Sequence, residues 1–70
     1  MAEAHITITV EEIAGDDFEK TITEALERIN GIDHVIVNRE NKKIFIEYDD
    51  EKISDRLIKE TIEDEGYIVK

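Results

Sequence analysis

The hydrophobic period of this chain changes from two to about 3.6 residues near position 16, and this change constrains the fold more than any other feature. Residues 5–10 alternate strictly between apolar and polar side chains, which predicts a strand buried on one face. From about residue 16 to 30 the apolar side chains fall three or four positions apart, which predicts an amphipathic helix. The apolar face of this helix consists of Phe18, Ile22, Ala25, Leu26 and Ile29.

The second half of the chain predicts two strands, a helix and a short last strand. Residues 32–38 and 43–48 read as strands joined by a hairpin turn, in which we expect Asn41 to take a positive φ. Ser54 is a suitable N-cap for the second helix, and residues 67–69 form the last strand. The helices are predicted to end at glycines, which suit the left-handed position after a helix: Gly31 and Gly66.

This order of elements, β-α-β-β-α-β, predicts an α+β fold, namely a ferredoxin-like sandwich in one domain over residues 1–70. We expect a four-stranded antiparallel sheet with both helices on one face. The inward strand residues are expected to be Ile6, Ile8, Val10, Val35, Val37, Ile44, Ile46 and Val69. The helix residues expected to pack onto them are Phe18, Leu26, Leu57 and Ile62.

Charge and composition exclude several classes of function. The chain has 19 acidic and 9 basic residues, and its formal net charge of −10 repels phosphate backbones and anionic lipid headgroups. We therefore expect neither nucleic-acid binding nor membrane binding. The absence of cysteine excludes disulfides and thiolate metal sites, and fits a cytoplasmic protein if the sequence is natural. No apolar run approaches the roughly 20 residues of a membrane span.

The turn from the first strand to the first helix, residues 10–18, is the natural place for a site, because the free N–H groups of a first helical turn attract anions. This turn has carboxylates, one glycine and apolar side chains, but no thiol, imidazole or hydroxyl. Asp16 and Glu19 have the spacing of a capping box, so we interpret them as helix caps. The alternative is a hard-cation site formed by Asp16 and Asp17 with Asp49 or Asp50.

Nothing in the sequence indicates catalysis, and we assign no catalytic, cofactor-binding or metal-binding residue. The serine and threonine hydroxyls have no evident base, so we expect no enzyme activity. His5 and His34 both fall on the outward face of their strands, which the third strand normally separates in this fold. We interpret them as surface residues rather than zinc ligands.

Three segments in this order resemble the heavy-metal-associated domain, the family of copper chaperones and of the N-terminal repeats of copper- and zinc-transporting P-type ATPases. Residues 31–38 look like its Gly-Val-x-x-Val-x-Val-Asn segment. Residues 46–49 resemble its Val-x-Tyr-Asp, and residues 62–67 are similar to its Ile-Glu-x-x-Gly-Tyr. The resemblance covers nearly the whole chain and implies the same fold.

The metal motif of that family, Gly-Met-x-Cys-x-x-Cys, is lost here. By the resemblance, Glu12 stands for the glycine, Ile13 for the methionine, and Gly15 and Phe18 for the two cysteines. The family's metal function therefore carries over to no residue, and we expect no cofactor. Ile13 still suits the apolar slot of the methionine, and Tyr67 is expected to cover the loop.

The outward face of the sheet is the candidate interaction surface. Ile36 and Phe45 lie on neighbouring predicted strands and point away from the helices, with Ile68 as a more distant apolar group. We expect a monomer, with weak dimerisation or partner docking through this open face as the alternative. No specific partner can be identified.

Three hypotheses for function follow. Local propensity agrees with the fold nearly everywhere, which suggests a designed or redesigned sequence made as a soluble recombinant protein. The first hypothesis is such a small stable scaffold without catalytic or metal-binding activity. The second is a natural degenerate member of the family that acts as a protein-interaction module through Ile36 and Phe45 or its acidic surface. The third is a weak divalent-cation binder that uses surface carboxylates.

Overall fold

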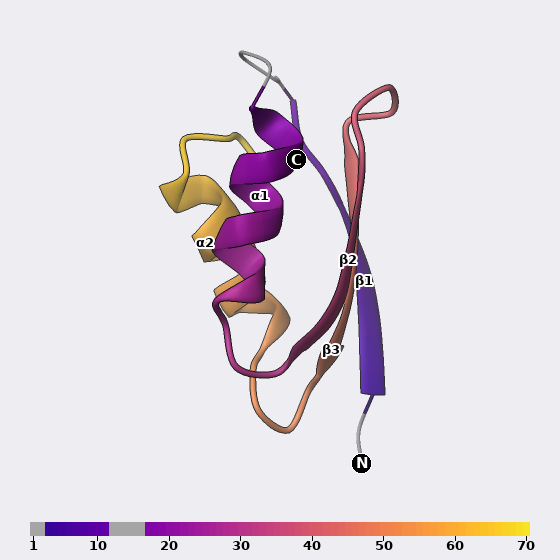
Figure 1. Cartoon of the computed structure of the whole chain (residues 1–70), viewed down its shortest axis with the longest axis vertical. Coiled ribbons are helices and arrows are strands. Elements are labelled where there is room, and N and C mark those ends of the chain that lie inside the picture. The colour runs from indigo at the N-terminus through magenta and orange to yellow at the C-terminus, as the bar shows by residue number, and fades with distance from the viewer. Residues whose placement is uncertain (1–2, 12–16) are drawn as a thin grey trace.

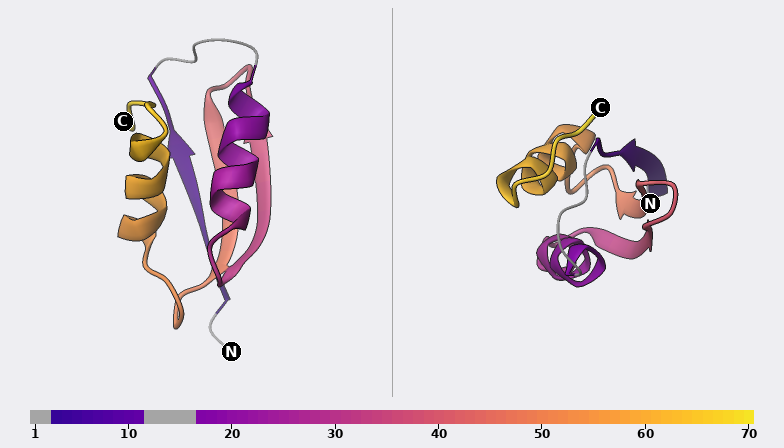
Figure 2. Two further views of the ribbon diagram at one scale, coloured as in Figure 1. Left: turned by 60° about the vertical axis from the view of Figure 1, so that its left-hand side comes forward. Right: turned by 90° about the horizontal axis from the view of Figure 1, so that it is seen from above.

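Two helices cover one face of an antiparallel sheet in the computed structural model, which describes residues 3–11 and 17–70 (Figure 1). The elements follow in the order β1 (Glu3–Thr9), α1 (Phe18–Glu27), β2 (Ile32–Asn38), β3 (Lys43–Asp49) and α2 (Asp55–Asp64). The strands lie in the order β1-β3-β2. Both views of Figure 2 place α1 on the β2 side of the sheet and α2 on the β1 side. The α+β class and the helices on one face are therefore confirmed.

The predicted fourth strand is wrong for the described residues, in which the sheet has three strands. The segment after α2 meets β1 through one antiparallel bridge, Val10 to Val69. Its two flanking backbone bonds join Glu11 N to Ile68 O and Lys70 N to Thr9 O, each at 2.9 Å. The segment reaches only the end of β1, and one bridge does not make a strand, because a strand needs consecutive pairs.

The core lies between the sheet and the helices, as the hydrophobic periods predict. Most of the expected inward positions are confirmed as buried or as half-buried against the core. The fully or nearly fully buried side chains are Ile8, Val10, Phe18, Ile22, Leu26, Ile44, Ile46, Tyr48, Ile53, Ile58 and Ile62. The partly buried ones include Ile6, Val35, Val37 and Val69.

One predicted core position is wrong: the Leu57 side chain is 41% exposed. Ile58, the next residue, is fully buried in its place. Ile58 and Ile62 lie four residues apart on one helical face, and Leu57 is rotated about 100° from Ile58 around the axis. The inward stripe of α2 therefore follows Ile58 and Ile62.

The ends of the helices largely follow the predicted caps. Ser54 Oγ accepts a hydrogen bond from Leu57 N at 3.3 Å, so Ser54 is the N-cap of α2. Gly31 and Gly66 take positive φ values of 115° and 96°. The predictions for Ser54 and Gly66 are confirmed. Gly31 has the predicted positive φ, but α1 ends at Glu27 with Arg28 as its C-cap, so Gly31 lies in the loop after α1 and does not end the helix.

The turn between β2 and β3 differs from its prediction, because Lys42, not Asn41, has the positive φ (57°). Lys42 N donates to Arg39 O at 3.3 Å, and Asn41 N donates to Asn38 Oδ1 at 3.2 Å. A turn closed in this way often places the residue that follows its central pair in the left-handed region, and here that residue is Lys42. Within the described residues, no helix is long and apolar enough to cross a membrane.

Candidate functional site

Phe18 is the first residue of α1 and is completely buried. Asp17 precedes it as the N-cap residue, and Thr21 N donates to Asp17 O at 2.8 Å, which closes the first turn. The resemblance to the metal-binding family assigns a thiolate to position 18. The structure instead places a phenyl ring there, directed into the core.

Tyr67 packs against Phe18 from the segment that follows α2. The two ring centroids are 5.0 Å apart and the ring planes make an angle of 78°. This edge-to-face arrangement is a favourable aromatic geometry. Neither ring offers a soft metal a thiolate or thioether donor, so the pair forms an apolar end of the core rather than a coordination site.

The predicted capping box is not seen in the part of the chain that the structure describes. Asp16 lies outside the described residues, as do Glu12, Ile13 and Gly15. Asp17 makes no side-chain cap hydrogen bond, although its carboxylate stands at the positive end of α1. Glu19, in the first turn, complements the helix dipole.

The structure separates the carboxylates that the cation hypothesis brings together. Asp17 precedes α1, whereas Asp49 N donates to Gly31 O at 2.8 Å, just past the other end of that helix. A ten-residue helix spans about 15 Å, and Figure 1 shows the start of α1 and the β3–α2 loop at opposite ends of the molecule. Asp49 Oδ1 also accepts from Glu51 N at 2.9 Å. Among the described residues, no group of three or more acidic, histidine or cysteine side chains could hold a metal ion.

The two histidines lie on the open face of the sheet, on either side of the central strand. His5 of β1 and His34 of β2 are each paired with Glu47 of β3. The His5 ring lies 5.7 Å from the Phe45 ring, centroid to centroid. These positions fit surface residues separated by the third strand.

The candidate interaction residues are only partly brought together. Ile36 and Phe45 form a direct cross-strand pair on the open face, where Ile36 is 51% exposed and Phe45 is half-buried. Ile68 is 54% exposed but lies beside Glu11, past the end of β1. The surface pair is therefore Ile36 and Phe45, and Ile68 is not part of it.

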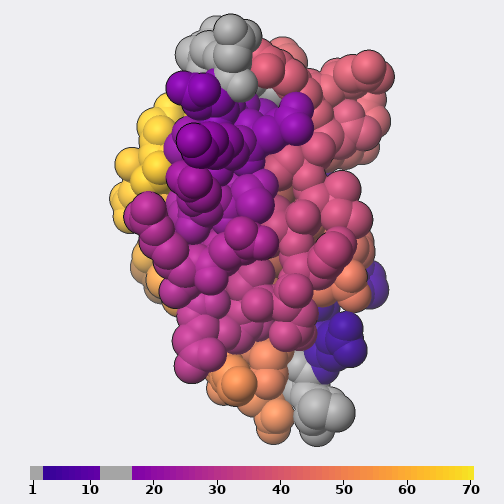
Figure 3. Space-filling view, in the orientation of Figure 1, coloured from indigo at the N-terminus to yellow at the C-terminus, as the bar shows by residue number. Residues whose placement is uncertain are grey.

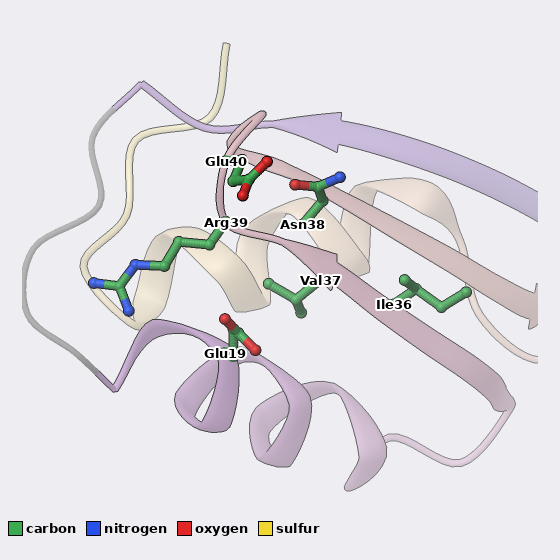
Figure 4. Close-up of a pocket in the computed structure, with 6 residues that line it drawn as sticks. All are labelled: Glu19, Ile36, Val37, Asn38, Arg39 and Glu40. Carbon is green, nitrogen blue, oxygen red and sulfur yellow. The ribbon is translucent and has the colours of Figure 1, made fainter.

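A shallow hollow of about 550 Å³ lies between the first turn of α1 and the end of β2, and sequence reasoning missed it. Its lining consists of Glu19 and residues 36–40 (Figure 4). Figure 3 shows α1 and β2 side by side on this surface. No hydroxyl, imidazole or thiol lines the hollow, so it offers no nucleophile. The hollow forms because α1 packs beside β2, and no local sequence pattern predicts that packing.

Tyr48 is a buried tyrosine near the C-terminal end of β3. Burial raises the pKa of its phenol above the ordinary value, and the charges of Asp55 and Asp50 raise it further. The phenol is neutral at physiological pH already with its ordinary pKa of 10.0, and the upward shift affects only its titration in alkaline solution. Tyr48 therefore acts as a core residue with a protonated hydroxyl.

Comparison with known proteins gives the same family as the residues do. Residues 7–67 match the heavy-metal-associated domain. The copper chaperone CopZ of Staphylococcus haemolyticus is 33% identical over 63 residues, which cover 90% of this chain and 93% of that protein. CopZ of Staphylococcus aureus strain JH9 is 34% identical over 62 residues, 89% of this chain and 91% of that protein.

Solved structures show the same fold. A structure described as CopZ metallochaperone superposes with a TM-score of 0.89 at 31% identity, over 96% of this chain and all of the other. The solution structure of a putative copper-ion-binding protein from Bacillus anthracis has a TM-score of 0.91 at 25% identity, over 99% and 97% of the two chains. With its family segments, its fold and these similarities in agreement, the chain belongs to the heavy-metal-associated domain family.

Proposed function

We propose that this chain is a metal-free, non-catalytic scaffold domain of its family. The observation that carries the proposal is the complete burial of Phe18, packed edge-to-face with Tyr67, at the family's second cysteine position. Burying a phenylalanine side chain stabilises a fold by roughly 1.5–3 kcal/mol. The site end of the domain contributes to stability in place of holding an ion.

The absence of thiols supports the lack of a copper site. Cu(I) selects soft sulfur ligands, and the sequence has no cysteine and one methionine, Met1. The relatives described as copper chaperones share the fold with this chain. Position 18, a cysteine in the family's motif, is Phe18 here, so their named cargo does not transfer to it.

The hydroxyl groups of Ser54, the N-cap of α2, and of Thr61 within α2 both form hydrogen bonds with backbone groups. Ser54 Oγ caps α2 by accepting from Leu57 N, and Thr61 Oγ donates to Leu57 O at 2.8 Å. A nucleophilic hydroxyl needs a base within hydrogen-bonding reach, and neither group has a recorded one. These contacts support a domain that performs no nucleophilic catalysis.

Calorimetric titration with Cu(I), Zn²⁺ and Ca²⁺ tests the proposal. We expect no site with a Kd below about 1 mM for any of the three ions. Thermal unfolding should also be unchanged by these ions or by chelators, because an ion bound to the folded state would raise the midpoint. A stoichiometric micromolar site would overturn the proposal.

A second candidate function is a protein-interaction module that uses the Ile36–Phe45 pair. The supporting observation is that two apolar side chains meet on a sheet face that the helices do not cover. Sedimentation velocity over a concentration series tests self-association through this face. Phe45→Lys should abolish any dimer, and Thr9→Lys, which adds the same charge near the end of β1, should not. Equal sedimentation of wild type and both variants at all concentrations would count against this role.

A designed or redesigned origin, expected from the regular use of local propensities, stays a prediction. A genome that encodes this chain would contradict it.

A further inference from the structure

The outer edge of β1 is unpaired over most of its length. One side of β1 pairs with β3 from Glu3 to Thr9. On the other side, within residues 3–11 and 17–70, the segment after α2 makes two backbone hydrogen bonds with this part of the chain, to Thr9 O and from Glu11 N. An unpaired edge presents a row of main-chain donors and acceptors that another strand can use.

The pattern of hydrogen bonds identifies the free groups. Successive residues of an antiparallel strand direct their main-chain groups to opposite sides. Val10 N donates to Lys42 O at 2.9 Å on the β3 side, and the β1–β3 register has no shift. The even-numbered residues of β1 therefore face β3, whereas His5 and Thr7 face the outer edge. Among the described residues, no hydrogen bond is recorded for the main-chain groups of His5 and Thr7.

A hollow of about 300 Å³ follows this edge. Residues 6–9 of β1 line it together with Lys59 of α2 and the last residues, Val69 and Lys70. The Ile6, Ile8 and Val69 side chains pack against the core and give it an apolar wall. The hollow lies where a neighbouring strand would continue the sheet, on the side that Figure 2 shows next to α2.

The charged groups of the hollow are both lysines. None of the acidic side chains that the structure describes lines it, although the chain has 19 acidic residues. Among the described residues, no ion pair is recorded for Lys59 or Lys70. The hollow is therefore a positive spot on an acidic protein. A second copy of the chain, with a formal net charge of −10, is disfavoured as its occupant by repulsion.

We propose that this edge binds an extended acidic segment of a partner protein by strand addition. The segment takes the place of a fourth strand and exchanges main-chain hydrogen bonds with His5 and Thr7. Its alternate apolar side chains lie beside Ile6 and Ile8 on the inner face. Its carboxylates reach Lys59 and Lys70, and the chemistry that selects the partner is thus an alternation of apolar and acidic residues.

NMR titration of the labelled protein tests the proposal, with a blocked six-residue peptide of alternating valine and aspartate as the probe. The free protein should exchange the His5 and Thr7 amide hydrogens quickly and protect those of Ile6 and Ile8. Saturation with the peptide should slow exchange at His5 and Thr7 at least tenfold. The matched peptide of alternating valine and lysine should bind at least tenfold more weakly.

Two variants separate the edge from the rest of the fold. Thr7→Pro removes an outward N–H and leaves the β1–β3 bonds intact, since proline is tolerated on strand edges. It should abolish binding of the valine–aspartate peptide. Lys59 is on the surface of α2 and lines the hollow, so Lys59→Glu should weaken that binding at least tenfold. Lys20 is on α1 and does not line it, so Lys20→Glu should not change the binding. If Thr7→Pro lowers stability, the comparison of Lys59→Glu with Lys20→Glu decides whether the acidic peptide binds at this edge.

Three outcomes would overturn the proposal. The first is the absence of any shift of the His5 and Thr7 amide signals at up to about 5 mM peptide. The second is equal affinity for the two peptides. The third is protection of the same amides by raised protein concentration alone, which would make a second copy the occupant.

Discussion

The Phe18 and Tyr67 rings lie nearly perpendicular, with 5.0 Å between their centroids and 78° between their planes. The first residue of α1 is thereby joined to the segment that follows α2, two parts of the chain far apart in sequence. The contact closes the end of the core that the family uses for metal. Phe18 stands at the position of the second cysteine in the family's motif, so the strength of the contact measures how much this end of the core stabilises the fold.

Replacement of Phe18 by alanine should therefore be strongly destabilising. The ring is completely buried, and we expect Phe18→Ala to lower the free energy of unfolding by about 3–5 kcal/mol. Urea unfolding measures this change, with half-buried Phe45→Ala as a control of smaller effect. Should Phe18→Ala fail to fold, a double-mutant cycle of Phe18→Leu and Tyr67→Leu should give a coupling of about 0.5–1.5 kcal/mol. A loss below about 1 kcal/mol for Phe18→Ala would contradict its core role.

The two helices should differ in their sensitivity at the N-cap. Ser54→Ala removes the hydrogen bond between Ser54 Oγ and Leu57 N, and should lower the free energy of unfolding by about 1 kcal/mol. Asp17→Ala removes a carboxylate that makes no cap hydrogen bond, and should change it by less than about 0.5 kcal/mol. Denaturant unfolding of both variants checks the difference, and a larger loss for Asp17→Ala would refute it.

The two glycines with positive φ should respond differently to alanine. A Cβ at Gly31 would lie 3.0 Å from Lys52 Cβ, whereas a Cβ at Gly66 would meet nothing within 4 Å. Each alanine pays the cost of a left-handed conformation, about 1–2 kcal/mol, and Gly31→Ala adds a steric conflict. Thermal unfolding should show the lower midpoint for Gly31→Ala. The reverse order would mean that the loop after α1 relaxes freely.

Tyr48 should make stability fall in alkaline solution. Burial, followed by the charges of Asp55 and Asp50, raises the pKa of its phenol above the value of 10.0 that it has when exposed. The unfolded chain therefore loses the phenol proton at a lower pH than the folded chain, and the stabilisation is complete below pH 10.0. It is lost as the pH rises from there through the folded pKa. Urea titrations at several alkaline pH values measure the free energy of unfolding. Tyr48→Phe should remove this part of its pH dependence. The same fall with pH in the wild type and in Tyr48→Phe would rule the effect out.

Much of the fold was predictable because its signals are local. The alternation of Ile6, Ile8 and Val10 and the helical spacing of Phe18, Ile22 and Leu26 each identify their element without knowledge of its neighbours. Ser54 and the glycines also act through nearby backbone groups. The loss of both cysteines could be recognised from the family segments alone.

The errors involve the placement of elements relative to one another. The last strand depended on how far residues 67–69 run along β1, and they meet it only at Val10. Leu57 and Ile58 are adjacent apolar residues, and only the docking of α2 decides between them. The distance between Asp17 and Asp49, and the hollow beside Glu19, likewise follow from tertiary packing rather than from a local pattern.

Competition for Cu(I) against a coloured chelator tests the proposed metal-free function, with the wild type and the double variant Gly15→Cys/Phe18→Cys compared. We expect the wild type to leave the chelator complex intact at equimolar protein. The double variant, with two thiolates at the family's positions, should withdraw one Cu(I) per chain once circular dichroism has shown that it folds. Stoichiometric withdrawal of Cu(I) by the wild type would show that the chain is not metal-free in function.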